Sequence, residues 1–152
     1  MPGSIHDWHY FTLDDVTQPV TMLAGLPPSD NDVVVLVEPE PEVSTGFLGR
    51  RKERDRGVNA VLWLANGYGR PDEWHVFVTF PESAPFERLG VVLPPGSRVC
   101  ASGKTDAELV LPPGMGHAEM LDFAIHACQR LAAEQLPGRW RAQIPDMNYR
   151  DS

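Results

Sequence analysis

The sequence predicts one α+β domain, with a mostly antiparallel sheet of about five or six strands, a long C-terminal helix packed on one face and short N-terminal helices. The clearest observation is the stretch 58–80, where two apolar runs flank a segment dense in turn-forming residues, the pattern of a β-hairpin. Short connections between most other apolar runs favour further hairpins and antiparallel neighbours. Only 117–136 has the length and periodicity of a long helix, so repeated parallel crossovers are not expected.

The length and the cysteine content indicate a single domain, 1–152, that needs no crosslinks. Its 15 prolines and 13 glycines indicate many turns and short elements. Cys100 and Cys128 are too few for a disulfide framework, and 1–11 lacks the basic and apolar regions of a secretory signal. We therefore expect a cytoplasmic protein.

The net charge of −8 makes two partner classes poor expectations. An acidic surface repels phosphate backbones and anionic lipids, so neither nucleic acid nor a membrane is expected as a partner. The apolar runs are also far shorter than the roughly 20 residues that span a bilayer.

The first elements are predicted to be two short helices and a buried strand. Thr12 is the expected cap of a helical turn, and a second short helix is expected over Pro19–Ala24, with Gly25 as its C-cap. The run 32–38 is β-branched and apolar at five consecutive positions, which is typical of a central strand covered on both faces. The alternating prolines and acids that follow predict an exposed, mobile, charged loop at about 39–57.

The central hairpin has two different faces. With its turn at Gly69, Leu64 lies opposite Trp74 and Leu62 lies opposite Val76. The period of two then places an apolar set on the core face: Leu62, Leu64, Trp74, Val76, Val78 and Phe80. The other face is mixed, with apolar residues beside a histidine and a threonine: Val61, Trp63, His75, Phe77 and Thr79. Either this face is partly covered or it is a surface for a partner.

Beyond this hairpin the sequence predicts a short strand at 87–93, a second hairpin and the long helix. The second hairpin pairs 98–101 with 107–111. The helix carries one apolar stripe: Leu121, Ala124, Ile125, Cys128, Leu131, Ala132 and Leu136. Phe123 falls on its polar side, and Trp140 and Ile144 are expected to order part of the tail after the helix.

Two patterns on the helix are typical of enzymes, but each is incomplete. His117 and Glu119 match half of a zinc-deaminase signature, whose other half, a pair of cysteines two residues apart, is absent. Asp122 and His126 share a helical face, where an aspartate can orient an imidazole as a general base. The nearest nucleophile in the sequence, Cys128, lies in the apolar stripe and is expected to be buried and inert.

Three further patterns have simpler interpretations than a binding site. His6 and His9, completed by His75 or Asp14, have metal-ligand chemistry, but we expect no metal. Segment 67–70 has glycines and a cation, yet a phosphate loop leads into a helix and here a strand follows. The run 50–56 has five basic and two acidic residues, while the rest of the chain has eight basic and nineteen acidic residues and so carries a charge of −11. This contrast favours a solvated loop, or a tether that pairs with acidic residues.

The unplaced aromatic residues supply the main functional hypothesis. We expect a non-catalytic, acidic protein-interaction domain without a cofactor, which acts as an accessory, chaperone-like or toxin-neutralising partner. Its predicted binding residues are Trp63, His75, Phe77 and Phe123. Its partner is expected to be another protein, including a second copy of itself as a homodimer. The alternative is a small-ligand-binding protein or an enzyme, with a pocket between the sheet and the helices lined by Trp63, His75, Asp122 and His126.

Overall fold

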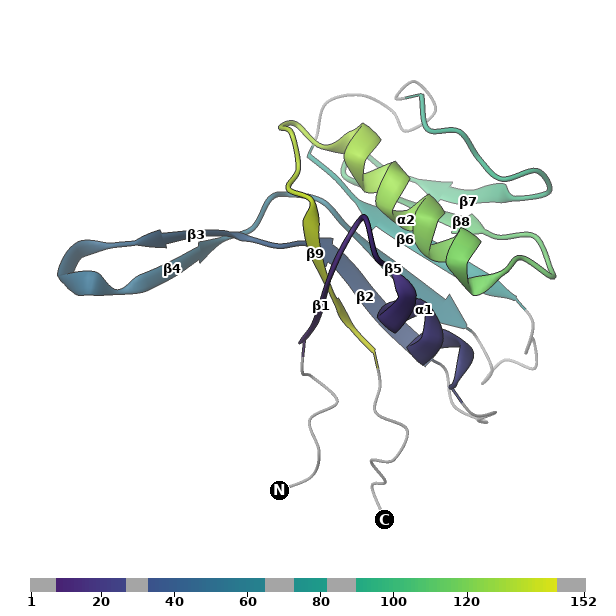
Figure 1. Cartoon of the computed structure of the whole chain (residues 1–152). Helices are drawn as coiled ribbons and strands as arrows, with labels where there is room; N and C mark the ends of the chain where they lie inside the picture. Colours follow the sequence, from purple (N-terminus) through teal and green to yellow (C-terminus); the bar gives the residue numbers. More distant parts are fainter. Residues whose placement is uncertain (1–7, 27–32, 65–72, 82–89, 145–152) are drawn as a thin grey trace, which may run out of the picture.

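The protein is an antiparallel sheet with two helices on one of its faces and a two-stranded ribbon that projects from one side (Figure 1). The structure is a computed structural model and describes residues 8–26, 33–64, 73–81 and 90–144. In this part of the chain the main sheet has seven strands in the order β1-β9-β2-β5-β6-β8-β7, and every neighbouring pair is antiparallel. The predicted class is therefore confirmed, while the sheet is wider than the five or six strands expected.

The elements follow each other along the chain as β1 (Trp8–Thr12), α1 (Thr17–Ala24), β2 (Val33–Pro39), β3 (Glu42–Thr45), the 3-10 turn η1 (Phe47–Gly49), β4 (Arg51–Arg54), β5 (Asn59–Leu64), β6 (Trp74–Thr79), β7 (Arg98–Ser102), β8 (Asp106–Val110), α2 (His117–Leu131) and β9 (Arg139–Gln143). Within the described ranges, neither α1 nor α2 has the length and apolar character that crossing a membrane requires.

The central hairpin is formed by β5 and β6 with the predicted register. Leu64 pairs with Trp74, and Leu62 pairs with Val76. Leu62, Val76 and Val78 are fully buried under α2, which packs on β2, β5 and β6. The expected turn centre, Gly69, lies outside the described residues. Strict alternation of side chains across a strand explains why this face could be predicted from the sequence alone.

The second hairpin and the long helix are also confirmed, with boundaries that differ from the prediction by one residue in the strands and by five in the helix. Strands β7 and β8 occupy the predicted segments, and α2 begins at His117 as expected. The helix ends at Leu131 rather than at 136, because Ala132 already has an extended backbone. The following residues lead the chain back to the sheet, where β9 begins. Of the expected strand 87–93, residues 87–89 lie outside the described residues, and residues 90–93 form no strand.

The expectation that Phe123 lies on a polar side of α2 is wrong. Its side chain is 6% exposed and belongs to the hydrophobic core. Helix α1 packs against α2, so α2 buries a wider arc than the single stripe that would face a sheet alone. Met120 and Ala127 are buried in the same arc.

The two ends of the described chain form strands that the sequence analysis missed. The segment around Thr12 was expected to start a helix, but Thr12 is the last residue of β1, and one short N-terminal helix, α1, follows. The expected tail contains β9, which lies between β1 and β2 and pairs with both. Trp140 and Ile144 do order this segment, since they are 0% and 1% exposed in the core.

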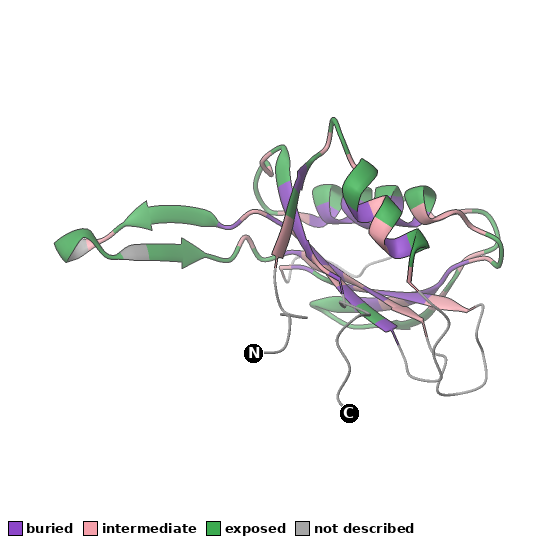
Figure 2. Cartoon of the chain, turned by 60° about the horizontal axis from the view of Figure 1, so that its bottom comes forward, coloured by how far each residue is buried: buried purple, intermediate pink, exposed green. Residues whose placement is uncertain are grey.

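The segment expected to be a loop, 39–57, contains the projecting ribbon formed by β3 and β4. We call residues 42–54 the arm. The arm continues the β2–β5 hairpin outward, with four residues between Val37 and Glu42 on one strand and five between Arg54 and Ala60 on the other. The extra residue is accommodated near Gly57, whose φ of 83° favours glycine. The arm has exposed side chains, as predicted, but a regular backbone (Figure 2).

The burial of Cys128 leads to a first testable prediction. Cys128 is 0% exposed and burial raises the pKa of its thiol to about 12, whereas Cys100 is exposed. A thiol reagent added to the native protein should therefore label Cys100 rapidly and Cys128 only as fast as the protein unfolds. In Cys100→Ser the rapid phase should disappear, and both thiols should react at once in denaturant. Rapid native labelling of Cys128 would contradict this packing.

Candidate functional site

The face of the sheet away from the two helices is the main candidate site, and we call it the open face (Figure 2). Cross-strand register places two rows of side chains on this face. One row consists of Val34, Trp63, His75 and Val110, and the next consists of Val61, Phe77 and Glu108. No described helix or strand covers these rows. Val34, on an interior strand, is 51% exposed, so the expectation that β2 is covered on both faces is wrong for the described chain.

Three aromatic rings form the centre of the open face. The ring centroids of Trp63 and His75 are 4.9 Å apart, and those of Trp63 and Phe77 are 5.7 Å apart, with tilted planes. The rings of His75 and Phe77 are stacked at 6.5 Å. Distances of this kind are typical of favourable aromatic pairs. The predicted residues Trp63, His75 and Phe77 are therefore brought together, and Trp63 and Phe77 remain partly exposed.

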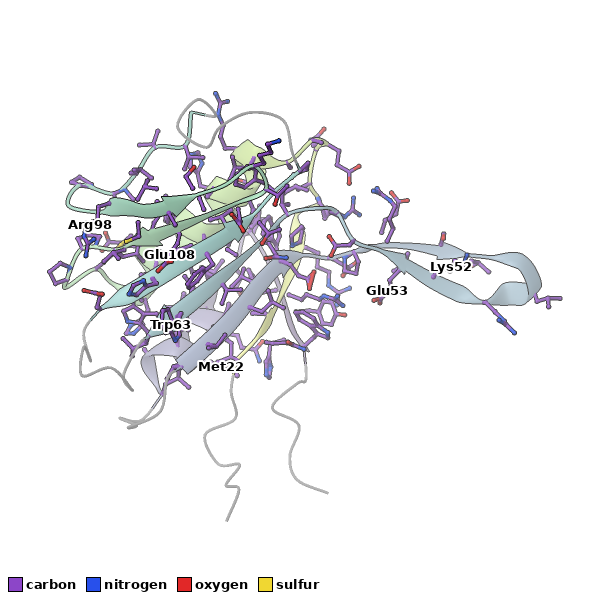
Figure 3. The ribbon with its side chains drawn as sticks, turned by 180° about the vertical axis from the view of Figure 1, so that it is seen from behind. Met22, Lys52, Glu53, Trp63, Arg98 and Glu108 are labelled. Carbon is purple, nitrogen blue, oxygen red and sulfur yellow. The ribbon has the colours of Figure 1, made fainter. Side chains whose placement is uncertain are left out.

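Two carboxylates hold the imidazole of His75. Its Nδ1 lies 2.8 Å from Oε2 of Glu108, and its Nε2 lies 3.0 Å from Oε1 of Glu73. Each ring nitrogen therefore already has a carboxylate partner within the chain. Trp63 and Glu108 lie on the same side of the sheet in Figure 3. The centre of the open face thus combines aromatic surface with negative charge.

A second cluster surrounds Arg141 on β9, at the β1 side of the open face. The guanidinium carbon lies 3.8 Å from the ring centroid of Trp8, and the side chain is 10% exposed. Its polar contacts are 3.3 Å to the Tyr10 hydroxyl, 3.5 Å to Glu38 and 3.8 Å to Glu53. Burial raises the pKa of Glu38, and the charge of Arg141 opposes that rise.

The arm is a separate candidate surface. Its tip is a hydrogen-bonded turn in which Leu48 is 78% exposed and has a φ of 65°. This left-handed conformation costs a residue other than glycine about 1–2 kcal/mol. Strain of this kind is often found at functional sites. Val43 on β3 is 44% exposed, and Lys52 on β4 is also exposed.

Ion pairs attach the base of the arm to the body. Arg54 contacts carboxylate oxygens of Glu42 and Glu134 at 3.1 Å each, and its hydrogen bond lowers the pKa of Glu42. Arg56 lies 3.7 Å from Glu134 and donates a 2.7 Å hydrogen bond to the carbonyl oxygen of Glu40. Each exposed pair contributes little alone, but together they define the direction in which the arm leaves the body.

A cavity of about 290 Å³ lies where the arm meets β1 and β9. Its lining is mostly polar or charged and consists of Tyr10, Glu40, Pro41, Val43, Glu53 and Arg139. The guanidinium of Arg139 lies over the Tyr10 ring at 4.4 Å and is 3.0 Å from a carboxylate oxygen of Glu40. The cavity thus has none of the residues that were predicted to line a pocket.

The other predicted site residues are separated from the aromatic cluster. Phe123 is buried in α2, which packs on the opposite face of the sheet. Asp122 and His126 are exposed on the outer side of α2, so they do not share a pocket with Trp63 and His75. His117 lies at the start of α2, with its ring edge-on to Trp74 at 6.3 Å.

The segment 67–70 and part of the candidate metal set lie outside the described residues. His6 and the segment 67–70 are among the undescribed positions, while His9 lies in β1. Within the ranges that the structure describes, no group of three or more His, Cys, Asp or Glu side chains is arranged to hold a metal ion.

Glu108 and Arg141 are the main residues of the open face that sequence reasoning missed. Glu108 belongs to another hairpin, and its position beside His75 depends on the pairing of β6 with β8. The signal for Arg141 was present in the alternation of polar and apolar residues over 139–144, which is typical of a strand with one buried face.

Comparison with known proteins found no match to a protein-family model, a curated protein or a solved structure.

Proposed function

We propose that this protein is a non-catalytic interaction domain that binds a basic, partly apolar segment of a protein partner through the open face. The observation that carries this proposal is the cluster of Trp63 and Phe77 beside the carboxylates of Glu73 and Glu108. The site is built on adjacent strands of a sheet whose opposite face is packed against a helix, so its geometry is rigid.

The chemistry of the open face suits a cationic segment. Partly exposed aromatic rings provide apolar contact area, and their faces attract Lys and Arg side chains. Glu73 and Glu108 add negative charge at the edge of the same cluster. Aromatic residues at the centre with polar groups around them are also the usual composition of protein interfaces. The exposed side chain of Val34 extends the apolar area across a neighbouring strand.

The alternative, a small-ligand site or an enzyme, has less support. Its expected pocket required Trp63 and His75 to face Asp122 and His126, and these pairs lie on opposite sides of the sheet and helix layer. Both ring nitrogens of His75 also lie within hydrogen-bonding distance of carboxylates of its own chain, so neither is directed at a substrate in this arrangement.

Site-specific photocrosslinking tests this proposal. A benzophenone side chain at position 34 lies on the open face, and the matched control at position 122 is on the exposed side of α2. We expect a protein to be crosslinked from position 34 and not from position 122. Trp63→Ala in the same chain should weaken the interaction at least about tenfold, as expected for a tryptophan at the centre of an interface. Equal capture from both positions, or none from position 34, would count against the open face as the binding surface.

A further inference from the structure

We infer that the segment bound by the open face is the arm of a second copy of this chain, so that two chains form a reciprocal, arm-exchanged homodimer. This inference rests on the proposed function, because it names the partner of the same surface. Its first support is the exposure of the arm beyond the contacts that Glu53 and Arg54 make with the body. The arm has two strands of four residues, and the described side chains of both strands are exposed. A two-stranded ribbon is at best marginally stable alone in water, and its unpaired edges invite further contacts.

The charge of the arm is opposite to that of the rest of the chain. The arm has four basic and two acidic residues and so carries +2, while the remainder has nine basic and nineteen acidic residues and carries −10. A second copy of the chain therefore presents a surface that attracts the arm, whereas a polyanion such as nucleic acid is repelled by the body. The charge pattern favours the second copy over nucleic acid.

The side chains of the arm also match the chemistry of the open face. Leu48 at the tip is an exposed apolar group, and Lys52, which pairs with Ser44, is an exposed cation between the tip and the base of the arm. On the open face, Trp63 and Phe77 supply apolar surface next to Glu73 and Glu108. The apolar part of the arm can pack on the aromatic cluster while its cation lies beside the carboxylates, so both kinds of contact form in one arrangement.

The direction of the arm requires that this contact form between two chains. The arm leaves the body sideways and away from its own open face in Figures 1 and 2, and Arg54 and Arg56 attach its base to Glu134. From Glu42 to Leu48 it extends roughly 17 Å, with about 3.3 Å per residue in the extended part and about 2 Å per residue in the 3-10 turn. The three strand spacings from β2 to β8 amount to roughly 14 Å, so the arm is long enough to cross the aromatic cluster of a partner. In a dimer with two-fold symmetry each arm–face contact occurs twice.

Sedimentation velocity of the full chain over a range of concentrations tests this inference. Wild type should dimerise, and Leu48→Glu in the arm should raise the dimer dissociation constant at least tenfold. The matched control Gln129→Glu adds the same charge on the exposed side of α2 and should leave the constant unchanged. Trp63→Ala and Val34→Lys on the open face should each weaken the dimer, and circular dichroism would verify that both variants are folded.

A mixing experiment tests the reciprocal geometry. Leu48→Glu keeps an intact open face and Trp63→Ala keeps an intact arm, so a mixture of the two has one unaltered arm–face contact. The mixed dimer should therefore form more tightly than either variant alone. With isotopically labelled and unlabelled chains, benzophenone at position 34 should crosslink to the segment 42–54 of the other copy.

Three outcomes would overturn the homodimer. A wild-type chain that stays monomeric, or a dimer unaffected by Leu48→Glu, would do so. Salt-sensitive binding of DNA that is abolished by Lys52→Glu would instead assign the arm to nucleic acid. If position 34 crosslinks a different protein while the chain is monomeric, the proposed function stands and the homodimer alone is wrong.

Discussion

Trp140→Ala is expected to lower the free energy of unfolding by about 3–5 kcal/mol, the range found when a buried tryptophan is truncated. Trp140 is 0% exposed and lies on β9, where it pairs with Phe11 of β1 and Pro39 of β2. Its indole nitrogen donates a 3.0 Å hydrogen bond to the carbonyl oxygen of Pro137. The substitution removes apolar contact at the point where β9 joins two other strands and leaves that carbonyl without this donor. Urea denaturation followed by circular dichroism measures the effect.

Arg139→Ala is the matched control for this prediction. Arg139 lies next to Trp140 on the same strand, but its side chain is 56% exposed and points to the other side of the sheet. Removing its contacts with Glu40 and Tyr10 should cost less than about 1 kcal/mol, because exposed ion pairs contribute little. If the two variants were equally stable, β9 would not hold the core together as the structure indicates.

The elements that were predicted correctly are those joined to a neighbour by a short connection. In β5 and β6 the alternation of apolar and polar residues fixes the face, and matching the apolar positions of the two strands gives the register. The same holds for β7 and β8. These signals are local, so they can be read from one sequence without knowledge of the rest of the fold.

The position of β9 could not be predicted, because its neighbours are distant in sequence. Trp8 pairs with Gln143, and Val37 pairs with Ala142, across more than a hundred residues. Period-two patterns show that such segments can be strands, but nothing in them specifies their partners. The arm was missed for a different reason, since Pro39 and Pro41 indicated a break. The ribbon resumes beyond them, and the opposite charges of Glu42 and Arg54 pair across it.

The candidate site was partly predictable for the same physical reason. Trp63, His75 and Phe77 share a hairpin, so their common face followed from the alternation in β5 and β6. The acidic character of that face depends on Glu108, which β8 supplies. Phe123 was misplaced because the width of the buried arc on α2 depends on α1, a helix remote in sequence.

Arg141→Met is expected to lower the free energy of unfolding by about 3 kcal/mol at neutral pH, since it removes one partner of a largely buried charge pair. Methionine retains apolar contact with Trp8, so the main loss is the positive charge beside Glu38. Fluorescence-detected denaturation of wild type and variant gives this difference directly. Adding Glu38→Gln should recover part of the loss, because the carboxylate left without a counter-charge is then absent as well.

The pH dependence of this loss separates charge from packing. Burial already raises the pKa of Glu38 in the folded protein, and removing Arg141 eliminates the main opposing interaction and raises that pKa further. A carboxyl group whose folded pKa exceeds its unfolded value favours folding most below the unfolded pKa, and this contribution is lost as the pH rises through the folded pKa. The deficit of Arg141→Met should therefore be small near pH 4 and grow toward pH 7. A deficit that is the same at both pH values would mean that Arg141 stabilises the sheet by stacking on Trp8 and not by its charge.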